Sequence, residues 1–261
     1  MLTSAPRRQF LEDYAKIRAA EGRGSEASAY YRALPFSDLT GRNSEQWRIR
    51  ARTFEYFTRR ILPRLSLERA CDILDLGAGN CWLSYRLAEL DHAPVAVDIF
   101  ADPRDGLGAA RNYPVHFPVI ESGFDELPFR ASRFDLAVFN SSLHYSSDYV
   151  RTLSEARRCL RPGGRVVILD SPVYQRREHG EAMRIERQIS FERRHGFRSE
   201  ALGSVEFFDL EMLKDLERKL SLTWEIHRPW YGWRWHLRPL RARLKGQRPP
   251  SRFWILVGKF Q

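Results

Sequence analysis

A glycine turn at the end of a short apolar run is the feature of this sequence that most clearly suggests chemistry. Asp75 lies in the run, and Gly77-Ala78-Gly79 follows it before leucines begin to recur at helical spacing. Glycine permits a tight turn and lets a ligand approach the backbone closely. Strand, turn and helix in this order are typical of sites that hold a nucleoside-bearing cofactor.

Trp82 distinguishes between two classes of such cofactors. A dinucleotide fingerprint would place a third glycine at this position, because a pyrophosphate and close helix packing leave no room for a side chain. Asp98 comes 19 residues after Gly79, about the distance at which an acidic side chain accepts both ribose hydroxyls. A helix cap or a loop carboxylate is the alternative for Asp98. The pattern points away from NAD and toward S-adenosylmethionine.

From the glycine turn onward, apolar runs alternate with helical stretches. The runs lie at 73–76, 95–98, 117–120, 134–139 and 166–169. This alternation predicts an α/β fold in which right-handed crossovers join parallel strands into a doubly wound sheet. Ligands bind beyond the carboxyl ends of such strands. The polar residues at or just beyond those ends are Asp75, Asp98, Asp125, Asn140 and Asp170.

The first seventy residues (1–70) are expected to form a helical cap that precedes the sheet. Ser44 is placed to cap a helix that carries Trp47 on its apolar face and stops at Pro63. That helix is either a lid over the ligand or a plain packing helix. An irregular aromatic link, 30–43, precedes the helix and could close on a substrate.

Residues 71–261 are expected to form the cofactor-binding domain, with two long insertions. One insertion, 171–204, contains a highly charged helical run. The other, 228–252, separates the last two strands, 223–227 and 253–259. These strands have no helix between them in the prediction, so we expect them to pair antiparallel. Connections of this length are usually functional or disordered.

Composition sets the broad class of the protein. With 261 residues, 43% of them hydrophobic, the chain can bury a full core and is not disordered as a whole. Three cysteines, Cys71, Cys81 and Cys159, lack metal-type spacing and read as buried thiols in a reducing compartment. We expect no metal site. No run of 18 apolar residues and no N-terminal signal core occur, which predicts a soluble, cytoplasmic protein without an integral membrane span.

The formal net charge of +10 is unevenly spread. Between Arg228 and Arg252 there are eight Arg or Lys residues and no acidic residue, interleaved with three Trp and one Tyr. Three interpretations are open. Arg238 and Arg241 could clamp a small or lipid-linked anionic substrate, the segment could follow a nucleic-acid backbone, or it could be a solvated face.

Taken together, these residues resemble the class I S-adenosylmethionine-dependent methyltransferases, in the quinone-biosynthesis-like (type 11) group. The resemblance extends from about Asp72 to Tyr174, and its motifs are strong only in combination. It implies S-adenosylmethionine as cofactor and a Rossmann-like seven-stranded sheet in the order 3-2-1-4-5-7-6. The matching segments are 74–79, 97–98, 124–129, 134–138, 143–145 and 160–164.

The resemblance also implies roles for individual residues in holding the cofactor. Gly77 to Gly79, including Ala78, line its methionine part, and Asp98 binds the ribose. Phe124 and Asp125 meet the adenine. The remaining expected cofactor-binding residues are Asp75, Ile99 and Asn140.

Two positions depart from the family pattern. Cys81 stands where a third glycine is frequent, and its small side chain should keep the turn. Gly123 stands where an acidic residue is frequent, which leaves Asp125 or the backbone at Phe124 to contact the adenine amine.

Methyl transfer depends mainly on orienting the acceptor, because the leaving group is a neutral thioether. His144 is the best candidate for a general base where an acceptor must lose a proton, with a structural hydrogen bond as the alternative. Tyr145 and Tyr174 are expected to orient the substrate, although aromatic packing explains them equally well. Asn140-Ser141-Ser142-Leu143 lacks the two prolines typical of enzymes that methylate base amines.

Three functional hypotheses follow from the sequence. The first is a methyltransferase for an oxygen or nitrogen of a small, anionic or lipid-linked acceptor. The alternatives are an RNA methyltransferase and a non-catalytic protein that retains cofactor binding. Fold alone does not separate them, and the sequence specifies neither the acceptor nor the oligomeric state.

Overall fold

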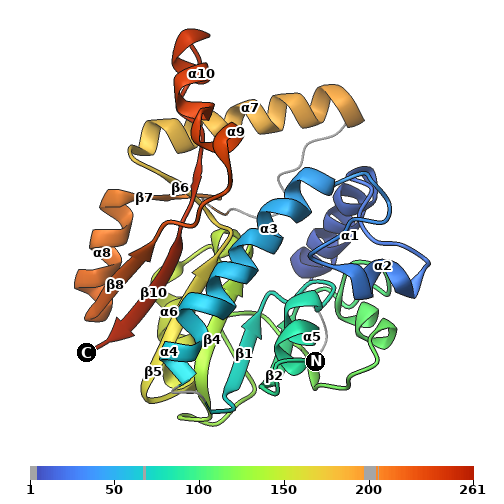
Figure 1. Ribbon diagram of the computed structural model, residues 1–261, viewed down its shortest axis with the longest axis vertical. Coiled ribbons are helices and arrows are strands. Elements are labelled where there is room, and N and C mark those ends of the chain that lie inside the picture. The colour runs from blue at the N-terminus through green and yellow to red at the C-terminus, as the bar shows by residue number, and fades with distance from the viewer. Residues whose placement is uncertain (1–4, 67–68, 197–203, 205) are drawn as a thin grey trace.

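A computed structural model describes residues 5–66, 69–196, 204 and 206–261. A twisted seven-stranded sheet runs through its centre (Figure 1), with the strands in the order β3-β2-β1-β4-β5-β10-β8. The strands are β1 (Asp72–Leu76), β2 (Ala93–Asp98), β3 (Val119–Glu121), β4 (Phe134–Asn140), β5 (Leu160–Leu169), β8 (Leu222–His227) and β10 (Ile255–Phe260).

Strand directions follow the predicted topology. β1 pairs in parallel with β2 and with β4, while β10 is antiparallel to both β5 and β8. Because β8 and β10 are the sixth and seventh strands of this sheet along the chain, the observed order is the predicted 3-2-1-4-5-7-6. The carboxyl ends of β1, β2 and β4 therefore meet at one edge, where the sequence places its candidate ligands.

Alternation along the strands gives the sheet two buried faces. Ile73 belongs to one hydrophobic cluster and Leu74 to the other, as expected when successive side chains point to opposite sides of a strand. Helices α3 (Ser44–Tyr56) and α5 (Trp82–Ala88) contribute to the first cluster. Helices α6 (Tyr149–Cys159) and α8 (Leu210–Leu220) contribute to the second, which makes three layers.

Aspartates start the two helices of the second face. The Asp148 carboxylate accepts hydrogen bonds from the N–H groups of Val150 and Arg151, at 2.9 and 3.0 Å. Asp209 accepts one from Met212, at 2.7 Å. These caps satisfy N–H groups that have no partner within the helix. The sequence already indicates both helices, and the caps fix where they begin.

The N-terminal segment is helical, but two details differ from the prediction. The elements are α1 (Ala5–Ala20), α2 (Ser28–Ala33), α3, a π-helical turn η1 (Phe57–Ile61) and α4 (Leu62–Ser66). Ser44 is the first helical residue and makes no capping bond to its own helix; its hydroxyl donates to Asp38, at 3.3 Å. Pro63 does not stop the helix, because the π-turn resets the backbone bonding and places proline in a first turn, where it needs no N–H donor.

The aromatic link expected at 30–43 is also more ordered than the sequence suggests. Tyr30 and Tyr31 lie in α2 and are buried in the first core cluster. The Tyr31 hydroxyl donates to the Arg104 carbonyl, at 2.7 Å. Tyr30 and Tyr31 are thus part of the core, and closure of the link on a substrate stays a prediction.

Beyond β5 the chain builds a smaller sheet and an arm. β6 (Pro172–Tyr174) pairs with β7 (Phe208–Asp209) and with β9 (Arg252–Phe253), and α7 (Arg177–His195) crosses above them (Figure 1). Part of the predicted insertion 171–204 lies outside the described residues. Two short helices, α9 (Trp233–His236) and α10 (Arg238–Leu244), separate β8 from β10, where none was predicted. Within the described part of the chain, no helix is long and apolar enough to cross a membrane.

Candidate active site

The glycine turn is held against the end of β4 by a contact that excludes a side chain. Gly77 has a φ of +74°, and a Cβ there would overlap Ser142 and lie 3.3 Å from the Phe124 ring. The Gly77 N–H donates to the Val97 carbonyl, at 2.8 Å. Cys81 then adopts a φ of 63°, so this cysteine takes the left-handed conformation for which glycine is the usual residue. This backbone conformation explains why a glycine is frequent at this position in the family that the sequence resembles.

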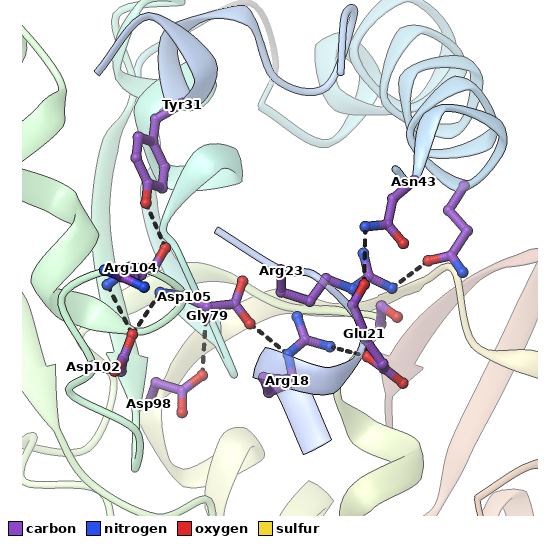
Figure 2. Close-up of polar contacts among 12 residues, drawn as sticks. Arg18, Glu21, Arg23, Tyr31, Asn43, Gly79, Asp98, Asp102, Arg104 and Asp105 are labelled. Carbon is purple, nitrogen blue, oxygen red and sulfur yellow. Dashed lines mark hydrogen bonds and ion pairs between the residues drawn. The ribbon is translucent and has the colours of Figure 1, made fainter. Parts of the chain in front are cut away.

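Asp98 closes β2 and binds the glycine turn through its carboxylate. One oxygen, Oδ2, accepts the Gly79 N–H at 2.8 Å, and the other accepts the Phe100 N–H at 2.9 Å. Burial raises the pKa of this carboxyl, although the backbone hydrogen bonds oppose the rise. Figure 2 shows Asp98 directly beneath Gly79. The Asp98 carboxylate therefore orders the turn, and both Asp98 and the turn line one open space at the edge of the sheet.

That space is a cleft of about 860 Å³, counted with the open region at its mouth, at the carboxyl edge of the sheet. We call it the central cavity. The sheet side contributes Gly77, Ala78, Gly79, Asn80, Asp98, Ile99, Phe124, Asn140, Ser141 and Ser142. The helices and loops around it contribute Tyr14, Arg18, Trp47, Arg50, Trp82, Asp105 and Tyr145.

Helix α1 closes one side of the central cavity with a charged contact. The Arg18 guanidinium is paired with the buried Asp105 carboxylate and lies 3.4 Å from Glu21 (Figure 2). These acidic neighbours raise the pKa of Arg18 against the opposing effect of burial. Tyr14 lies one turn earlier, its ring edge-on to Tyr145 at 6.4 Å between centroids. Arg18 thus joins the cap to the loop that follows β2.

Helix α3 supplies the second arginine of the cavity. Arg50 stacks over the Trp47 ring at 4.8 Å and donates to the Ser141 hydroxyl at 3.4 Å. No ion pair joins it to a carboxylate in the described part of the chain, although the charge of Asp170 attracts it. Burial and the positive charges of Arg23 and Arg18 lower the pKa of Arg50 to about 10. An anion in the cavity would relieve this unbalanced positive charge.

Seven of the nine cofactor contacts and one of the four substrate contacts that the sequence predicts lie on the wall of the central cavity. The predicted residues that line the cavity are Gly77, Ala78, Gly79, Asp98, Ile99, Phe124, Asn140 and Tyr145. Asn140 Oδ1 is buried and finds no hydrogen-bond partner within the described residues. This orphaned acceptor and the two glycines of the turn fit a polar, nucleoside-sized ligand.

Tyr145 is the one predicted substrate residue on the cavity wall, and the other seven residues are predicted cofactor contacts. The other two cofactor residues lie elsewhere. Asp75 is fully buried beneath the turn, where it accepts a hydrogen bond from Ser84 at 2.7 Å. Asp125 accepts one from Thr152 at 2.7 Å. The adenine contact predicted for Asp125 stays a prediction that this bond does not favour.

His144 lies behind the cavity rather than on its wall. It belongs to the short 3₁₀ turn η3 (Leu143–Tyr145), is buried, and shares a 3.2 Å hydrogen bond between Nδ1 and the Ser171 hydroxyl. Burial, with Arg187 and Arg50 nearby, lowers its pKa to about 3. An imidazole with that pKa is a weak base at neutral pH. The predicted base role therefore lacks geometric support, and the structural hydrogen bond is the role that the contacts show.

The three remaining substrate residues are also outside the cavity wall. Tyr174 is buried against the Phe207 ring, edge-on at 5.9 Å between centroids. Arg238 stacks on Trp235 and donates to the Ser251 carbonyl at 2.7 Å. Arg241 lies exposed on α10. The predicted clamp of Arg238 and Arg241 on a substrate thus gains no support from the position of the cavity.

Sequence reasoning missed the residues that the cap brings to the cavity. Arg18 follows Tyr14 by four residues, and Arg50 follows Trp47 by three, so each pair shares one helical face. That spacing was a usable signal, because an arginine on an otherwise apolar face is unusual. Asp105 lies in a loop, and nothing in its local sequence indicates its partner.

Comparisons with known proteins agree with this geometry. Residues 74–168 match the family model described as a methyltransferase domain. Demethylmenaquinone methyltransferase of Thermus thermophilus is 35% identical over 122 residues, which are 44% of this chain and 54% of that protein. The matches cover between 36% and 54% of the length of the four curated relatives.

Solved structures share the fold over much more of the chain. The PH0226 protein of Pyrococcus horikoshii has a TM-score of 0.57 at 18% identity, covering 89% of this chain and 99% of that one. A 1,6-didemethyltoxoflavin-N1-methyltransferase of Burkholderia thailandensis, solved with S-adenosylhomocysteine, has a TM-score of 0.51 at 17% identity, covering 100% and 93%. The solved structures confirm the predicted Rossmann-like fold, and the match of residues 74–168 to a methyltransferase domain agrees with the resemblance seen in the sequence.

Proposed function

We propose that this chain, with its methyltransferase domain at residues 74–168, transfers a methyl group from S-adenosylmethionine to an oxygen or nitrogen of a small molecule. The observation that carries the proposal is the glycine turn beside Asp98 in the central cavity. Gly77 lets the turn pack closely against Ser142, whereas a Cβ at Gly79 would have no atom nearer than the Asp105 carbonyl oxygen at 3.8 Å, so a ligand can approach the backbone there. Fold alone would not support an activity.

Asp98 is the residue that we assign to the ribose. Each carboxylate oxygen accepts one backbone N–H and keeps a second lone pair for a hydroxyl donor. The apolar side chains of Ile99 and Phe124 stand beside it on the cavity wall and suit a flat base. This arrangement supports an adenosine-shaped ligand lying across the ends of β1 and β2.

Arg50 is the residue that we assign to the cofactor's carboxylate. Its guanidinium faces the cavity without an ion pair in the described part of the chain, and S-adenosylmethionine carries one carboxylate. An arginine holds a carboxylate bidentately when both are in one plane. The alternative, an anionic acceptor at the same guanidinium, is an outcome of the experiment below.

When bound, the cofactor supplies a methyl group attached to a sulfonium sulfur. Transfer of that methyl group leaves the cofactor as a neutral thioether. The chain's contribution is therefore to hold the acceptor in line and to keep water out. Tyr14, Trp47 and Tyr145 form an aromatic border to the cavity that can stack on a planar acceptor. We assign His144 no proton transfer, because its ring packs behind Tyr145 at 4.4 Å between centroids, does not line the cavity, and has a pKa that burial lowers to about 3.

The size and charge of the acceptor are inferred from the lining of the cavity and from the names of similar proteins. The relatives named above act on a demethylmenaquinone and on a didemethyltoxoflavin, according to their names. Aromatic walls in this cavity are consistent with an acceptor of that size. We include an anionic or lipid-linked acceptor in the proposal, because the Arg50 guanidinium in the cavity could hold an anionic group of the acceptor instead of the cofactor's carboxylate.

Calorimetry with S-adenosylhomocysteine tests the cofactor site. We expect binding by the unmodified protein and at least a tenfold loss of affinity in Asp98→Ala. Asp148→Ala is the matched control, because it also removes a carboxylate that accepts backbone N–H groups, but at the start of α6. Absence of binding, or equal losses in both variants, would argue against the proposal.

A pair of ligands separates the two assignments for Arg50. Methylthioadenosine shares the adenosine and thioether of S-adenosylhomocysteine but lacks its carboxylate. If Arg50 holds the cofactor, Arg50→Gln weakens S-adenosylhomocysteine at least tenfold and leaves methylthioadenosine unchanged. Unchanged affinity for both ligands would instead assign Arg50 to the acceptor.

The acceptor is identified by labelling a cell extract with a cofactor whose methyl group is deuterated. Mass spectrometry should find the label in a small molecule when wild-type protein is added, and not with Asp98→Ala. Label in RNA would replace this proposal with an RNA methyltransferase. Tight cofactor binding without any labelled product would favour a non-catalytic protein.

A further inference from the structure

The segment 228–252, which we call the C-terminal arm, takes no part in the central cavity. Helices α9 and α10 form its outer part and project away from the sheet (Figure 1). They are nearly continuous, because the Leu237 N–H donates to the Trp233 carbonyl at 2.9 Å and the Arg241 N–H donates to the Leu237 carbonyl at 3.0 Å. The arm therefore presents about three turns of helix to the surroundings.

One side of this helix is apolar and exposed. Trp233, Leu237, Leu240 and Leu244 are separated by four, three and four residues, which is the spacing of a single helical face. Their exposed fractions are 75%, 41%, 55% and 80%. A contiguous apolar stripe on a protein surface marks an interaction site.

The flanking positions are basic. Arg234, Arg238, Arg241 and Lys245 repeat with the same spacing one residue later, and Arg243 adds a further positive charge. The arm has no acidic residue that could balance them. A partner that covers this helix must therefore be both apolar and anionic.

The base of the arm is fixed to the body of the protein. The buried Tyr231 hydroxyl donates to the Phe253 carbonyl at 2.9 Å and lies 2.9 Å from the Thr53 hydroxyl on α3. Arg248 is paired with Glu186 of α7 at 2.8 Å. The apolar stripe is thus held outward by a rigid base, so its exposure is a feature of the fold.

We propose that the C-terminal arm docks this protein on an anionic membrane surface. Amphipathic helices of this kind lie in the plane of the interface, with Trp and Leu at the acyl boundary and Arg and Lys against lipid phosphates. A nucleic-acid groove would use arginines and stacked rings, but it gives no reason for three aligned leucines. The apolar stripe and its basic flanks together therefore favour a lipid surface over RNA.

This docking goes beyond the proposed methyl transfer and does not depend on it. The arm's exposed residues do not line the central cavity, so cofactor binding and membrane binding are separate measurements. A protein held at the membrane would have its cavity close to acceptors that partition into lipid. That consequence applies only if both proposals hold.

Flotation with vesicles of phosphatidylcholine, with or without 30% phosphatidylglycerol, tests the docking. We expect the full chain to float with the anionic vesicles and not with the neutral ones. Leu240→Glu/Leu244→Glu and Arg243→Glu/Lys245→Glu should each reduce the bound fraction at least tenfold. The matched control is Leu39→Glu/Leu90→Glu, which adds the same charges at leucines of 58% and 47% exposure outside the arm.

All variants are first checked for unchanged thermal unfolding and S-adenosylhomocysteine affinity. Failure to float with anionic vesicles would overturn the proposal, as would equal losses in the arm variants and the control. Binding of an RNA oligonucleotide that survives Leu240→Glu/Leu244→Glu, without vesicle binding, would assign the arm to nucleic acid. Cofactor binding that persists when flotation fails would leave the methyltransferase proposal standing.

Discussion

At the scale of single residues, the site depends on groups whose surroundings alter their ordinary behaviour. Asp75 is a fully buried carboxyl with one hydrogen bond, from Ser84, and its Oδ1 has no partner within the described residues. Burial raises its pKa from 3.8 to about 7. Its position beneath the glycine turn makes it a support of the turn's strand rather than a ligand contact.

Asp75→Asn should change how stability depends on pH. A carboxyl whose pKa is raised in the folded state loses protons sooner in the unfolded chain, so its contribution to stability falls as pH rises from about 4 to about 7. Asp75→Asn has no such titration, so its free energy of unfolding should lack this decrease. In the wild type the decrease is at most about 4 kcal/mol, at roughly 1.4 kcal/mol per pKa unit. Urea unfolding at pH 5 and pH 8 measures it. A difference between variant and wild type that is the same at both pH values would contradict the prediction.

Gly77→Ala tests the close approach of the turn to β4. The new Cβ would overlap Ser142 and would force a left-handed backbone on alanine, so we expect lower stability and at least a tenfold loss of S-adenosylhomocysteine affinity. Gly163→Ala is the matched control, because Gly163 has a φ of +82° with nothing within 4 Å of its Cβ position. The control should lose about 1–2 kcal/mol of stability and no affinity. Calorimetry and thermal unfolding distinguish the two variants.

At the scale of elements, helices and strands with a long hydrophobic pattern are predicted correctly from the sequence. Elements that depend on tertiary packing are not. The repeating leucines of α8 and the apolar runs of β4 and β5 are visible in the sequence. The π-turn η1 is not visible, because it depends on how α3 and α4 lie on the sheet. The helices α9 and α10 were missed because their apolar stripe faces outward, whereas sequence reasoning expects such a stripe to face a core.

Gly180→Ala is a prediction about one element, α7. In an isolated helix this change would stabilise by about 1 kcal/mol, but here the Cβ would overlap the Phe207 ring. We therefore expect a loss of about 1–3 kcal/mol from overpacking, measured by urea unfolding. Phe207→Leu should restore part of that loss in the double variant, and strict additivity of the two changes would show that they do not interact.

At the scale of the whole molecule, the central cavity exists only where the cap meets the sheet. Arg18 of α1 reaches Asp105 in the loop after β2, and Arg50 of α3 reaches Ser141 after β4. A ligand that contacts the glycine turn is therefore enclosed by segments far apart in the sequence. Its binding should stabilise the cap together with the sheet edge.

Hydrogen exchange measures this coupling. Saturating S-adenosylhomocysteine should slow exchange of the backbone amides in α1 and α3 as well as in residues 77–82. Helix α8 serves as the internal control, because it packs on the opposite face of the sheet and contributes nothing to the cavity. Protection confined to 77–82 would show that the cap does not close over the ligand.

The sequence by itself determined the α/β class and the glycine turn, and its resemblance to a known family implied the strand order. The class and the turn follow from local patterns, because each strand, turn and helix is continuous in the chain. Only the tertiary structure placed Arg18 and Arg50 at the cavity, buried His144 behind it, and turned the apolar stripe of the C-terminal arm outward. Each of these depends on contacts between segments that are distant in sequence, and local spacing carries no information about which distant partner a side chain will meet.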